Sequence, residues 1–446
     1  MKEWSNGVVS LYEGDARNLP AAIGDQSVHC IVTSPPYWGL RNYGLGKWIG
    51  GNPQCEHALP ERPTPRHYTN GQGGTGRNFT SWGDRGGRDR DCVKCGAVQV
   101  GEGIGLEPTF DDWLDAMRDV GREMWRVLRN DGTLWLNVGD AYANTGKSGL
   151  AGWTAGGRTP VYGIIGERAD SGLGLPASSL IGMPWRLAFA YQQQGWILRS
   201  AIVWHKPNPM PESVQSRPTT AYEMVFLFAK RYPYFYDAEA IKQPSVQPWD
   251  DRKARAKRQH KSAPTAERNG MRARADGQPT GGYAMANARN VWSIPTQGRG
   301  IKHFATFPDE LARRCIAAGT SEHGVCSVCG APWERIVERL GGTIGQSWHG
   351  HDADDAVGQS QSSWPGGVQG AQLGNGPYQV RHLGWRPTCE HGDAERRPAT
   401  VLDPFIGSGT TAEMAMGLGR HAIGVELHPA YLEIAIGRLA SRLPIA

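Results

Sequence analysis

The stretch TVLDPFIGSGTT, residues 400–411, is the strongest fold signal in the sequence. Residues 400–402 are a short apolar run typical of a buried strand, and residues 410–418 have the composition of a helix. Glycines in the turn between them allow a ligand to approach the backbone closely. Glu426 ends the next apolar run, where a carboxylate can bind ribose hydroxyls. This order predicts a nucleotide-type site, although the third glycine of a dinucleotide fingerprint is missing from its usual place.

Seven short apolar runs rich in branched residues predict the strands of one sheet. They are residues 8–12, 28–33, 133–138, 197–204, 223–228, 400–402 and 422–426. Helical patterns occupy residues 113–128, 180–193, 308–318, 410–418 and 429–442. The alternation predicts an open, mostly parallel sheet covered on both faces. Residues 197–204 and 223–228 have no clear helix between them, so we expect antiparallel neighbours at one edge.

A second motif, Thr33-Ser34-Pro35-Pro36-Tyr37, directly follows the apolar run at residues 28–32. Its position predicts a rigid loop at the carboxyl edge of the sheet, where open α/β folds bind ligands. Prolines donate no backbone hydrogen bond, so nearby carbonyls are free to accept one from an amino group. The serine hydroxyl adds an acceptor and the tyrosine a stacking face, which suits a flipped base. A plain proline-rich turn is the alternative interpretation.

The two motifs together resemble the amino-group DNA methyltransferases of the β arrangement, whose catalytic motif precedes the cofactor motif. Residues 11–15, 132–140, 195–211 and 303–311 are similar to further motifs of that family, so the resemblance covers most of the chain. It implies an α/β fold, namely the Rossmann-like, seven-stranded, circularly permuted sheet of an S-adenosylmethionine-dependent methyltransferase. It also implies double-stranded DNA as the substrate.

Residue roles follow from the same resemblance. The catalytic loop would be Ser34, Pro35, Pro36 and Tyr37. The S-adenosylmethionine site would be formed by Asp15, Phe307, Pro308, Asp403, Phe405, Gly407, Gly409, Thr410 and Glu426. In this family Ser-Pro-Pro-Tyr leans toward N4 of cytosine and Asp-Pro-Pro-Tyr toward N6 of adenine. We therefore expect N4-cytosine methylation, with N6-adenine as the alternative. A cytosine-C5 enzyme would need a Pro-Cys loop, and the sequence has no such dipeptide.

Cysteine and histidine recur in two similar clusters. Each has a Cys-x2-Cys-Gly-Ala knuckle and a Cys-x-His pair, in reversed order. The expected ligands are Cys55, His57, Cys92 and Cys95, and then Cys326, Cys329, Cys389 and His391. Three thiolates and one imidazole make a tetrahedral zinc site, so we expect two structural zinc ions in zinc-ribbon-like insertions. Pairing across the two halves, redox cysteines and cysteines without metal remain alternatives.

Basic residues cluster between Lys242 and Arg274, which is typical of a polyanion-binding segment or of a solvated loop. Lys206, Asn208 and Arg217 are further candidates for DNA contact or for loop packing. We expect the catalytic half of the core in residues 1–44 and 106–235 and the cofactor half in 301–320 and 398–446. Zinc insertions would occupy residues 45–105 and 321–397, the latter with a low-complexity loop, and target recognition residues 236–300.

Composition sets outer limits on the function. The 446-residue chain carries a net charge of +5 and has no long apolar run or signal-peptide pattern. We therefore expect a soluble, cytoplasmic protein without membrane association, and the family resemblance favours a homodimer. Two rival functions stay open: a methyltransferase acting on RNA or protein, and a non-catalytic zinc-ribbon DNA-binding protein.

Overall fold

The computed structural model describes residues 3–38, 47–52, 54–57, 92–100, 103–107, 109–143, 173–176, 178–212, 214–244, 285–297, 307–340, 379–392 and 394–441. The basic tract and most of the low-complexity loop lie outside these residues. The chain divides into two compact units. The first comprises Met1–Tyr236, Asn290–Gly324 and Arg397–Ala446, and the second comprises Asp237–Arg289 and Val325–Arg396.

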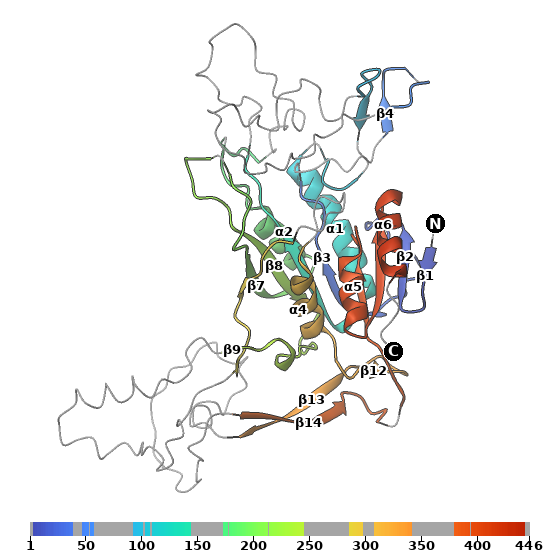
Figure 1. Ribbon diagram of the computed structural model, residues 1–446, viewed down its shortest axis with the longest axis vertical. Helices are drawn as coiled ribbons and strands as arrows, with labels where there is room; N and C mark the ends of the chain where they lie inside the picture. The colour runs from blue at the N-terminus through green and yellow to red at the C-terminus, as the bar shows by residue number, and fades with distance from the viewer. Residues whose placement is uncertain are drawn as a thin grey trace, which may run out of the picture. The chain divides into compact units, whose positions relative to one another are not determined.

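A nine-stranded sheet forms the centre of the first unit (Figure 1). In spatial order its strands are β1 (Glu3–Ser5), β2 (Val9–Glu13), β17 (His421–Glu426), β16 (Thr400–Asp403), β3 (Val28–Thr33), β6 (Leu128–Val138), β8 (Tyr222–Ala229), β7 (Ile197–His205) and β11 (Val291–Ser293). The strands from β2 to β6 are all parallel, and β7 is parallel to β11. Only β1 and β8 run against their neighbours. The sheet is therefore open and mostly parallel, as the sequence predicts.

All seven expected strands are present, but the sheet has nine strands, two more than expected. The additional strands β1 and β11 are three residues long each and form the two edges. A strand of that length contains too few residues for a periodic pattern, which explains why the sequence does not reveal it. The predicted antiparallel pairing of β7 with β8 is confirmed. Its predicted position at the edge is wrong, because β11 lies outside β7.

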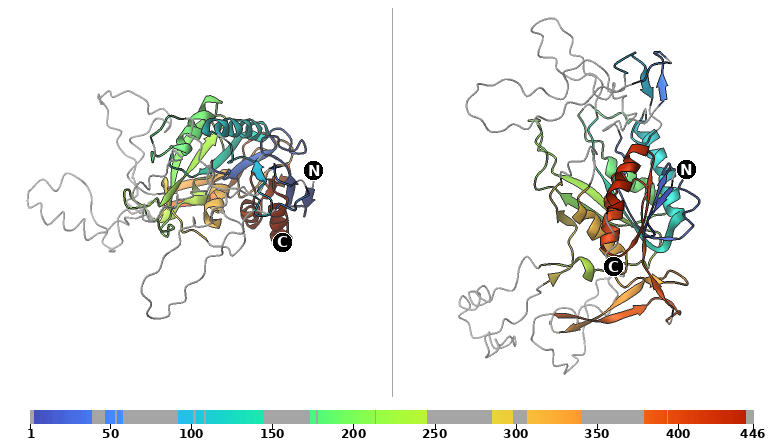
Figure 2. Two further views of the ribbon diagram at one scale, coloured as in Figure 1. Left: turned by 90° about the horizontal axis from the view of Figure 1, so that it is seen from above. Right: turned by 45° about the vertical axis from the view of Figure 1, so that its right-hand side comes forward.

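Helices cover both faces of the sheet (Figure 2, left). On one face α1 (Phe110–Val127) packs with α2 (Met183–Gln193), and on the other α4 (Asp309–Gly319) packs with α5 (Thr410–Gly417). The last helix, α6 (Pro429–Ala440), packs against β2 and β17. The five expected helices are thus all present. Among the described residues, no helix has both the length and the apolar character needed to cross a membrane.

The longest helix, α1, shows how the sequence fixes local structure. Thr109 caps its first turn, and a reciprocal capping box with Asp112 starts the helix three residues before the expected apolar face at Trp113. That face is fully buried in the core together with strand residues of β3 and β6. The capping box therefore sets where α1 begins, and the apolar stripe sets which side faces the sheet.

The second unit is built mainly from a long β-ribbon. Its strands β13 (Trp333–Leu340) and β14 (Gln379–Pro387) are antiparallel over their whole length. Short elements accompany them: β12 (Val325–Cys326) paired with β15 (Arg396–Arg397), a 3-10 helix (Glu239–Ile241), and β9 (Gln243–Pro244) paired with β10 (Met285–Ala286). Arg335 of the ribbon bonds the buried carboxylate of Asp237 at 3.0 Å. Most of residues 236–300, which we expected to recognise the target, and most of residues 321–397, which we expected to be a zinc insertion, fall in this compact unit.

Candidate active site

Four neighbouring parallel strands end in residues that the sequence singles out. Thr33 ends β3, Asp403 ends β16 and Glu426 ends β17, while Asp15 lies two residues after β2. Since parallel strands share one carboxyl edge, these residues lie at the same edge of the sheet although hundreds of residues separate them. In Figure 1, blue strands from the start of the chain accordingly lie beside red elements from its end.

Asp403 joins the two sequence motifs. One carboxylate oxygen accepts hydrogen bonds from the Thr33 hydroxyl at 2.6 Å and the Phe405 amide at 3.0 Å. The other accepts from the Thr411 hydroxyl at 2.6 Å. Burial raises the pKa of Asp403 to about 6, against the opposite effect of these donors. Because the side chain is only 2% exposed and bonds both motifs, we infer that it positions the two loops rather than contacting a cofactor.

The glycine turn is held onto the next strand. The Ile406 amide donates to the Val425 carbonyl at 3.0 Å, and Gly407, at a positive φ of 50°, donates its amide to Glu426 Oε2 at 2.9 Å. Glu426 Oε1 accepts from the His428 amide, also at 2.9 Å. Burial raises the pKa of Glu426 to about 7. Each carboxylate oxygen keeps a lone pair, so Glu426 can still accept hydrogen bonds from a ligand.

Helix α5 begins directly at this turn. Its N-cap, Gly409, has a φ of 87° and provides no side-chain cap for the first turn. The buried Thr410 hydroxyl has no hydrogen-bond partner among the described residues. Arg438 of α6 donates to the carbonyl and the hydroxyl of Ser408 and so fixes the turn from the other side. Free backbone amides and an unpartnered hydroxyl at a helix N-terminus favour a ligand with anionic or polar groups.

The remaining expected cofactor residues lie around this turn. Phe405 is half-buried and packs at the rim of the core. Asp15 bonds Arg17 with both oxygens, and the preceding Gly14 donates to the Glu426 carbonyl at 2.9 Å. Pro308 caps α4 at its N-terminus, with Phe307 before it. Gly319, at the other end of α4, lies close to Cys30 and Thr133, which are in the middle of β3 and β6.

The loop after β3 is held from below by the Trp113 indole, which donates to the Pro36 carbonyl at 3.0 Å. The Pro36 carbonyl is therefore occupied, whereas the described residues supply no donor to the Pro35 carbonyl. Tyr37 packs so closely on Gly139 that a Cβ there would lie 2.6 Å from the ring. The expected free acceptors of the loop are thus reduced to Ser34 and Pro35.

A polar chain leads from Ser34 into the protein. The Ser34 and Tyr37 hydroxyls lie 3.1 Å apart, and the Tyr37 hydroxyl lies 2.8 Å from Glu223 Oε2 and 3.2 Å from Asn137 Oδ1. Lys206 forms an ion pair with Glu223 and lies 4.6 Å from the centre of the Trp204 ring. The Lys206 ammonium group therefore already has partners within the protein. Asn137 and Glu223 were not among the predicted site residues, although the amide of Asn137 inside an apolar strand was an available signal.

The other two proposed DNA contacts also have partners within the protein. Asn208 accepts from the Thr296 amide at 2.9 Å, and Arg217 bonds Glu212 at 2.6 Å. Arg217 also lies 4.1 Å from the centre of the Tyr142 ring. These contacts favour the loop-packing interpretation of both residues.

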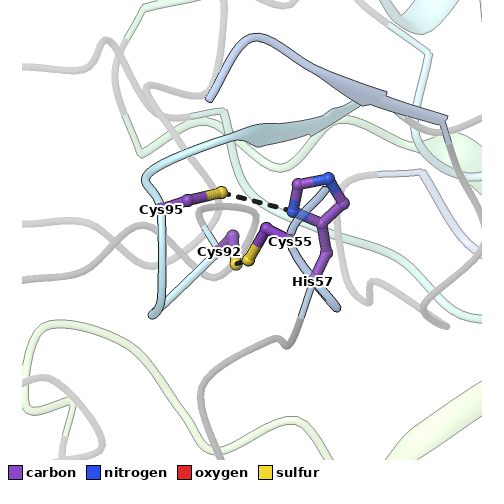
Figure 3. Close-up of side chains that lie close together, drawn as sticks. All are labelled: Cys55, His57, Cys92 and Cys95. Atoms are coloured by element: carbon purple, nitrogen blue, oxygen red, sulfur yellow. Dashed lines mark hydrogen bonds between the residues drawn. The ribbon is translucent and has the colours of Figure 1, made fainter. Parts of the chain in front are cut away.

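The eight predicted metal ligands come together as two groups of four. Figure 3 shows the first, in which Cys55, His57, Cys92 and Cys95 converge from two segments. The second contains Cys326, Cys329, Cys389 and His391. Within each group the ligand atoms all lie within 4.8 Å of one another. The grouping follows the two halves of the sequence.

Comparison with known proteins places the chain in a family. A family model described as DNA methylase, of the N6/N4 type, matches residues 28–327 and 395–437. The chain is similar to type II methyltransferase M.Cfr9I of Citrobacter freundii, with 30% identity over 96% of this chain and 87% of that one. It is similar to type II methyltransferase M.SmaI of Serratia marcescens, with 29% identity over 96% and 90%. It also aligns with the cytosine-N4-specific PvuII DNA methyltransferase at 14% identity over 97% and 86%, with a TM-score of 0.43.

The protein is therefore an α/β methyltransferase. It belongs to the N6/N4 DNA methylase family, whose model spans both the proline loop and the glycine turn.

We expect Thr33→Val to lower the free energy of unfolding by about 1–3 kcal/mol, because it removes a donor from the buried Asp403 carboxylate. Thr33→Ser keeps the hydroxyl and should lose only about 1 kcal/mol, the value of one buried methyl group. Urea denaturation at pH 8, where Asp403 is ionised, measures both. Equal losses in the two variants would contradict the role given to the hydroxyl.

Proposed function

We propose that this protein is a site-specific type II DNA methyltransferase that transfers a methyl group from S-adenosylmethionine to N4 of cytosine. The observation that carries the proposal is the buried Asp403, which bonds both the proline loop and the glycine turn at one sheet edge. A reaction between a base and a nucleotide cofactor needs the two sites side by side. The proposed fold is the circularly permuted form of the methyltransferase sheet, since the strand before the glycine turn is central in the sheet but late in the chain.

The residues at the glycine turn fit S-adenosylmethionine. Glu426 can accept hydrogen bonds from the ribose hydroxyls, and the uncapped start of α5 with the buried Thr410 hydroxyl suits the carboxylate of the methionine part. Asp15 and Phe405 would contact the adenosine, and Phe307 and Pro308 the methionine end. When bound, the cofactor supplies an activated methyl group on a positively charged sulfur. We also propose a structural zinc ion in each Cys/His group.

The proline loop would hold the base. Ser34 Oγ and the Pro35 carbonyl accept the two amino hydrogens, which turns the nitrogen lone pair toward the methyl group. The same two acceptors stabilise the positive charge that develops on the nitrogen. Tyr37 would stack on the extruded base. No covalent nucleophile is required, because the amino nitrogen itself would take the methyl group. The bond from sulfur to the methyl carbon would break, S-adenosylhomocysteine would leave, and the nitrogen would lose one proton to solvent.

The polar chain beneath the loop determines which way the serine hydroxyl points. A tyrosine hydroxyl has one proton, and the carboxylate of Glu223, at 2.8 Å, is its strongest acceptor. The Ser34 proton is then donated to the Tyr37 oxygen, which leaves the lone pairs of Ser34 available to the base. Lys206 compensates the charge of Glu223, so this arrangement is electrostatically balanced. Glu223 is in this view a positioning residue.

The choice of target base rests on the motif. In the resembled family, Ser-Pro-Pro-Tyr is more often associated with N4-cytosine, and N6-adenine is the second candidate. Nucleoside mass spectrometry of duplex DNA incubated with the protein and S-adenosylmethionine tests the function directly. We expect N4-methylcytosine. N6-methyladenine would keep the enzyme class and reverse the base, and the absence of both would overturn the proposal.

Ser34→Ala should lower the methyl-transfer rate by about 10²–10³-fold, the usual effect of removing one preorganised hydrogen-bond partner of the transition state. The affinity for S-adenosylmethionine should stay within about twofold, because Ser34 lies in the other loop. Single-turnover rates and calorimetric titration with the cofactor measure the two effects. Ser27→Ala, at the opposite end of β3, is the matched control. Equal loss of rate and affinity in Ser34→Ala would mean that the loop has another role.

Cofactor binding should depend on the ionisation of Glu426. Its pKa is raised to about 7, so a proton competes with the ribose hydroxyls as the pH falls through that value. From pH 8 to pH 6 we expect the affinity for S-adenosylmethionine to fall about tenfold. Glu426→Gln should bind more weakly and with little pH dependence over this range. An unchanged pH profile in this variant would assign the dependence to another group, such as Asp403.

We further propose that residues 236–300 recognise the target sequence and that the protein acts as a homodimer. The support is the basic composition of residues 252–274 and the family resemblance. Deleting residues 252–274 should abolish sequence-specific DNA binding and leave cofactor affinity unchanged. Gel-shift competition between specific and random duplexes measures this. Site-specific methylation by the deletion variant would refute the assignment.

A further inference from the structure

The two Cys/His groups share one backbone geometry. In both knuckles the glycine after the second cysteine, Gly96 or Gly330, has a φ of 71° and donates its amide to the carbonyl of the first cysteine at 2.9 Å. The first cysteine amide in turn bonds the alanine carbonyl that follows, at 2.7 Å in one knuckle and 2.9 Å in the other. Such a turn points two sulfurs at one position. Two segments more than 200 residues apart have thus reached the same ligand-presenting turn.

In the first group, two ligand-atom spacings are close to those expected around a tetrahedral zinc ion. With zinc–sulfur bonds of about 2.3 Å and zinc–nitrogen bonds of about 2.0–2.1 Å, ligand atoms lie about 3.8 Å apart for two sulfurs and about 3.6 Å for sulfur and nitrogen. Cys55 Sγ and Cys92 Sγ lie 3.9 Å apart, and Cys95 Sγ lies 3.3 Å from His57 Nδ1 (Figure 3). These sulfurs are also too far apart to be bonded to each other. Three thiolates with one imidazole is a donor set typical of structural zinc sites.

The second unit has little else to hold it together. Among its described residues, the buried hydrophobic side chains apart from proline are Ile241, Val325 and Cys326. A core of that size cannot offset the conformational entropy of an ordered unit, and small units of this kind depend on a cross-link or a metal. The ligands of the second group flank the two strands of the ribbon, where a bound metal would join the strands at one end. Cys326 and Cys329 precede the start of β13, and Cys389 and His391 follow the end of β14.

Within the described residues, hydrogen bonds also join the two sides of this base. Thr388 bonds the Pro332 carbonyl through its hydroxyl at 2.6 Å and its amide at 3.3 Å, and Ser327 bonds the Glu395 carbonyl at 2.8 Å. Farther along the ribbon, the Arg335–Asp237 ion pair joins it to the segment that begins the proposed recognition region. Loosening the base of the ribbon therefore also loosens the anchor of that region within the same unit.

We propose that zinc bound by Cys326, Cys329, Cys389 and His391 is the structural clamp of the second unit, and that DNA binding depends on it while cofactor binding does not. The DNA part of this inference rests on the proposed function. The proposed cofactor residues Glu426, Thr410 and Gly407 all belong to the first unit, which has a large hydrophobic core of its own. Cys55, His57, Cys92 and Cys95 form an equivalent site in the first unit.

The test begins with the zinc content of the full-length protein, purified without chelators and measured by inductively coupled plasma mass spectrometry. We expect two zinc ions per chain in the wild type and one in Cys389→Ser. Cys315→Ala is the matched control, because Cys315 is buried in α4 and belongs to neither group, and it should retain two. No zinc in the wild type, an iron–sulfur absorption band, or two ions in Cys389→Ser would overturn the site.

The clamp role is then measured on the same proteins. Cys389→Ser should lose about 10³-fold in affinity for its DNA target, toward the non-specific level, while its affinity for S-adenosylmethionine stays within about twofold. Full DNA affinity with one zinc lost would refute the clamp. Because the zinc count needs neither DNA nor methylation, it stands or falls independently of the proposed function.

A measurement on the wild type avoids any folding defect of the variant. Titration with an organomercurial should release two zinc ions as the six cysteines of the two groups react. Zinc release without loss of DNA binding, or fewer than six ligand thiols accompanying release, would count against the clamp and the ligand assignment respectively.

Discussion

One buried carboxylate holds the candidate site together. Asp403 accepts hydrogen bonds from the end of β3, from the glycine turn and from the first turn of α5. Further links between the same elements are the pairing of β3 with β16 and the hydrogen bond from the Thr411 hydroxyl to the Val32 carbonyl at 3.3 Å. The cost of burying the carboxylate, visible in its raised pKa, is offset by three donors placed in fixed positions.

The site is also built in two layers, with different tasks for each. Ser34, the Pro35 carbonyl and Glu426 keep unused acceptor capacity and so are available to ligands. In the second layer, hydrogen bonds join Asp403, Glu223 and Arg438 to other residues of the protein. These bonds hold the first layer in place. Charged residues at this edge of the sheet are therefore not all ligand contacts. Those whose polar atoms are already bonded within the protein support the residues that keep free acceptors.

Much of this was readable in the sequence because it depends on local pattern. All seven apolar runs became strands, and the repeated knuckle with its Cys-x-His pair identified two groups that the structure brings together. Three-residue edge strands were missed because they carry no periodicity. Asn137 and Glu223 were missed, and the link that Asp403 makes between the two motifs was not foreseen, for a different reason. Their partners lie far away in the chain, and only the register of the sheet reveals them. Motifs encode residue types, whereas tertiary pairing decides which of them face a ligand.

The strand order has a consequence for how the protein is made. The central strand β16 lies between β3 and β17 in the sheet. Strands β2 and β3 are therefore synthesised long before their neighbours β17 and β16, which begin at His421 and Thr400. A chain growing on the ribosome at about 5–20 residues per second exposes the edge of β3 for tens of seconds before β16 emerges. During that interval the edge is a surface for mispairing, and the reactive edge of the sheet does not exist. Strands β16 and β17 are therefore required to complete the sheet edge at which the two motifs meet.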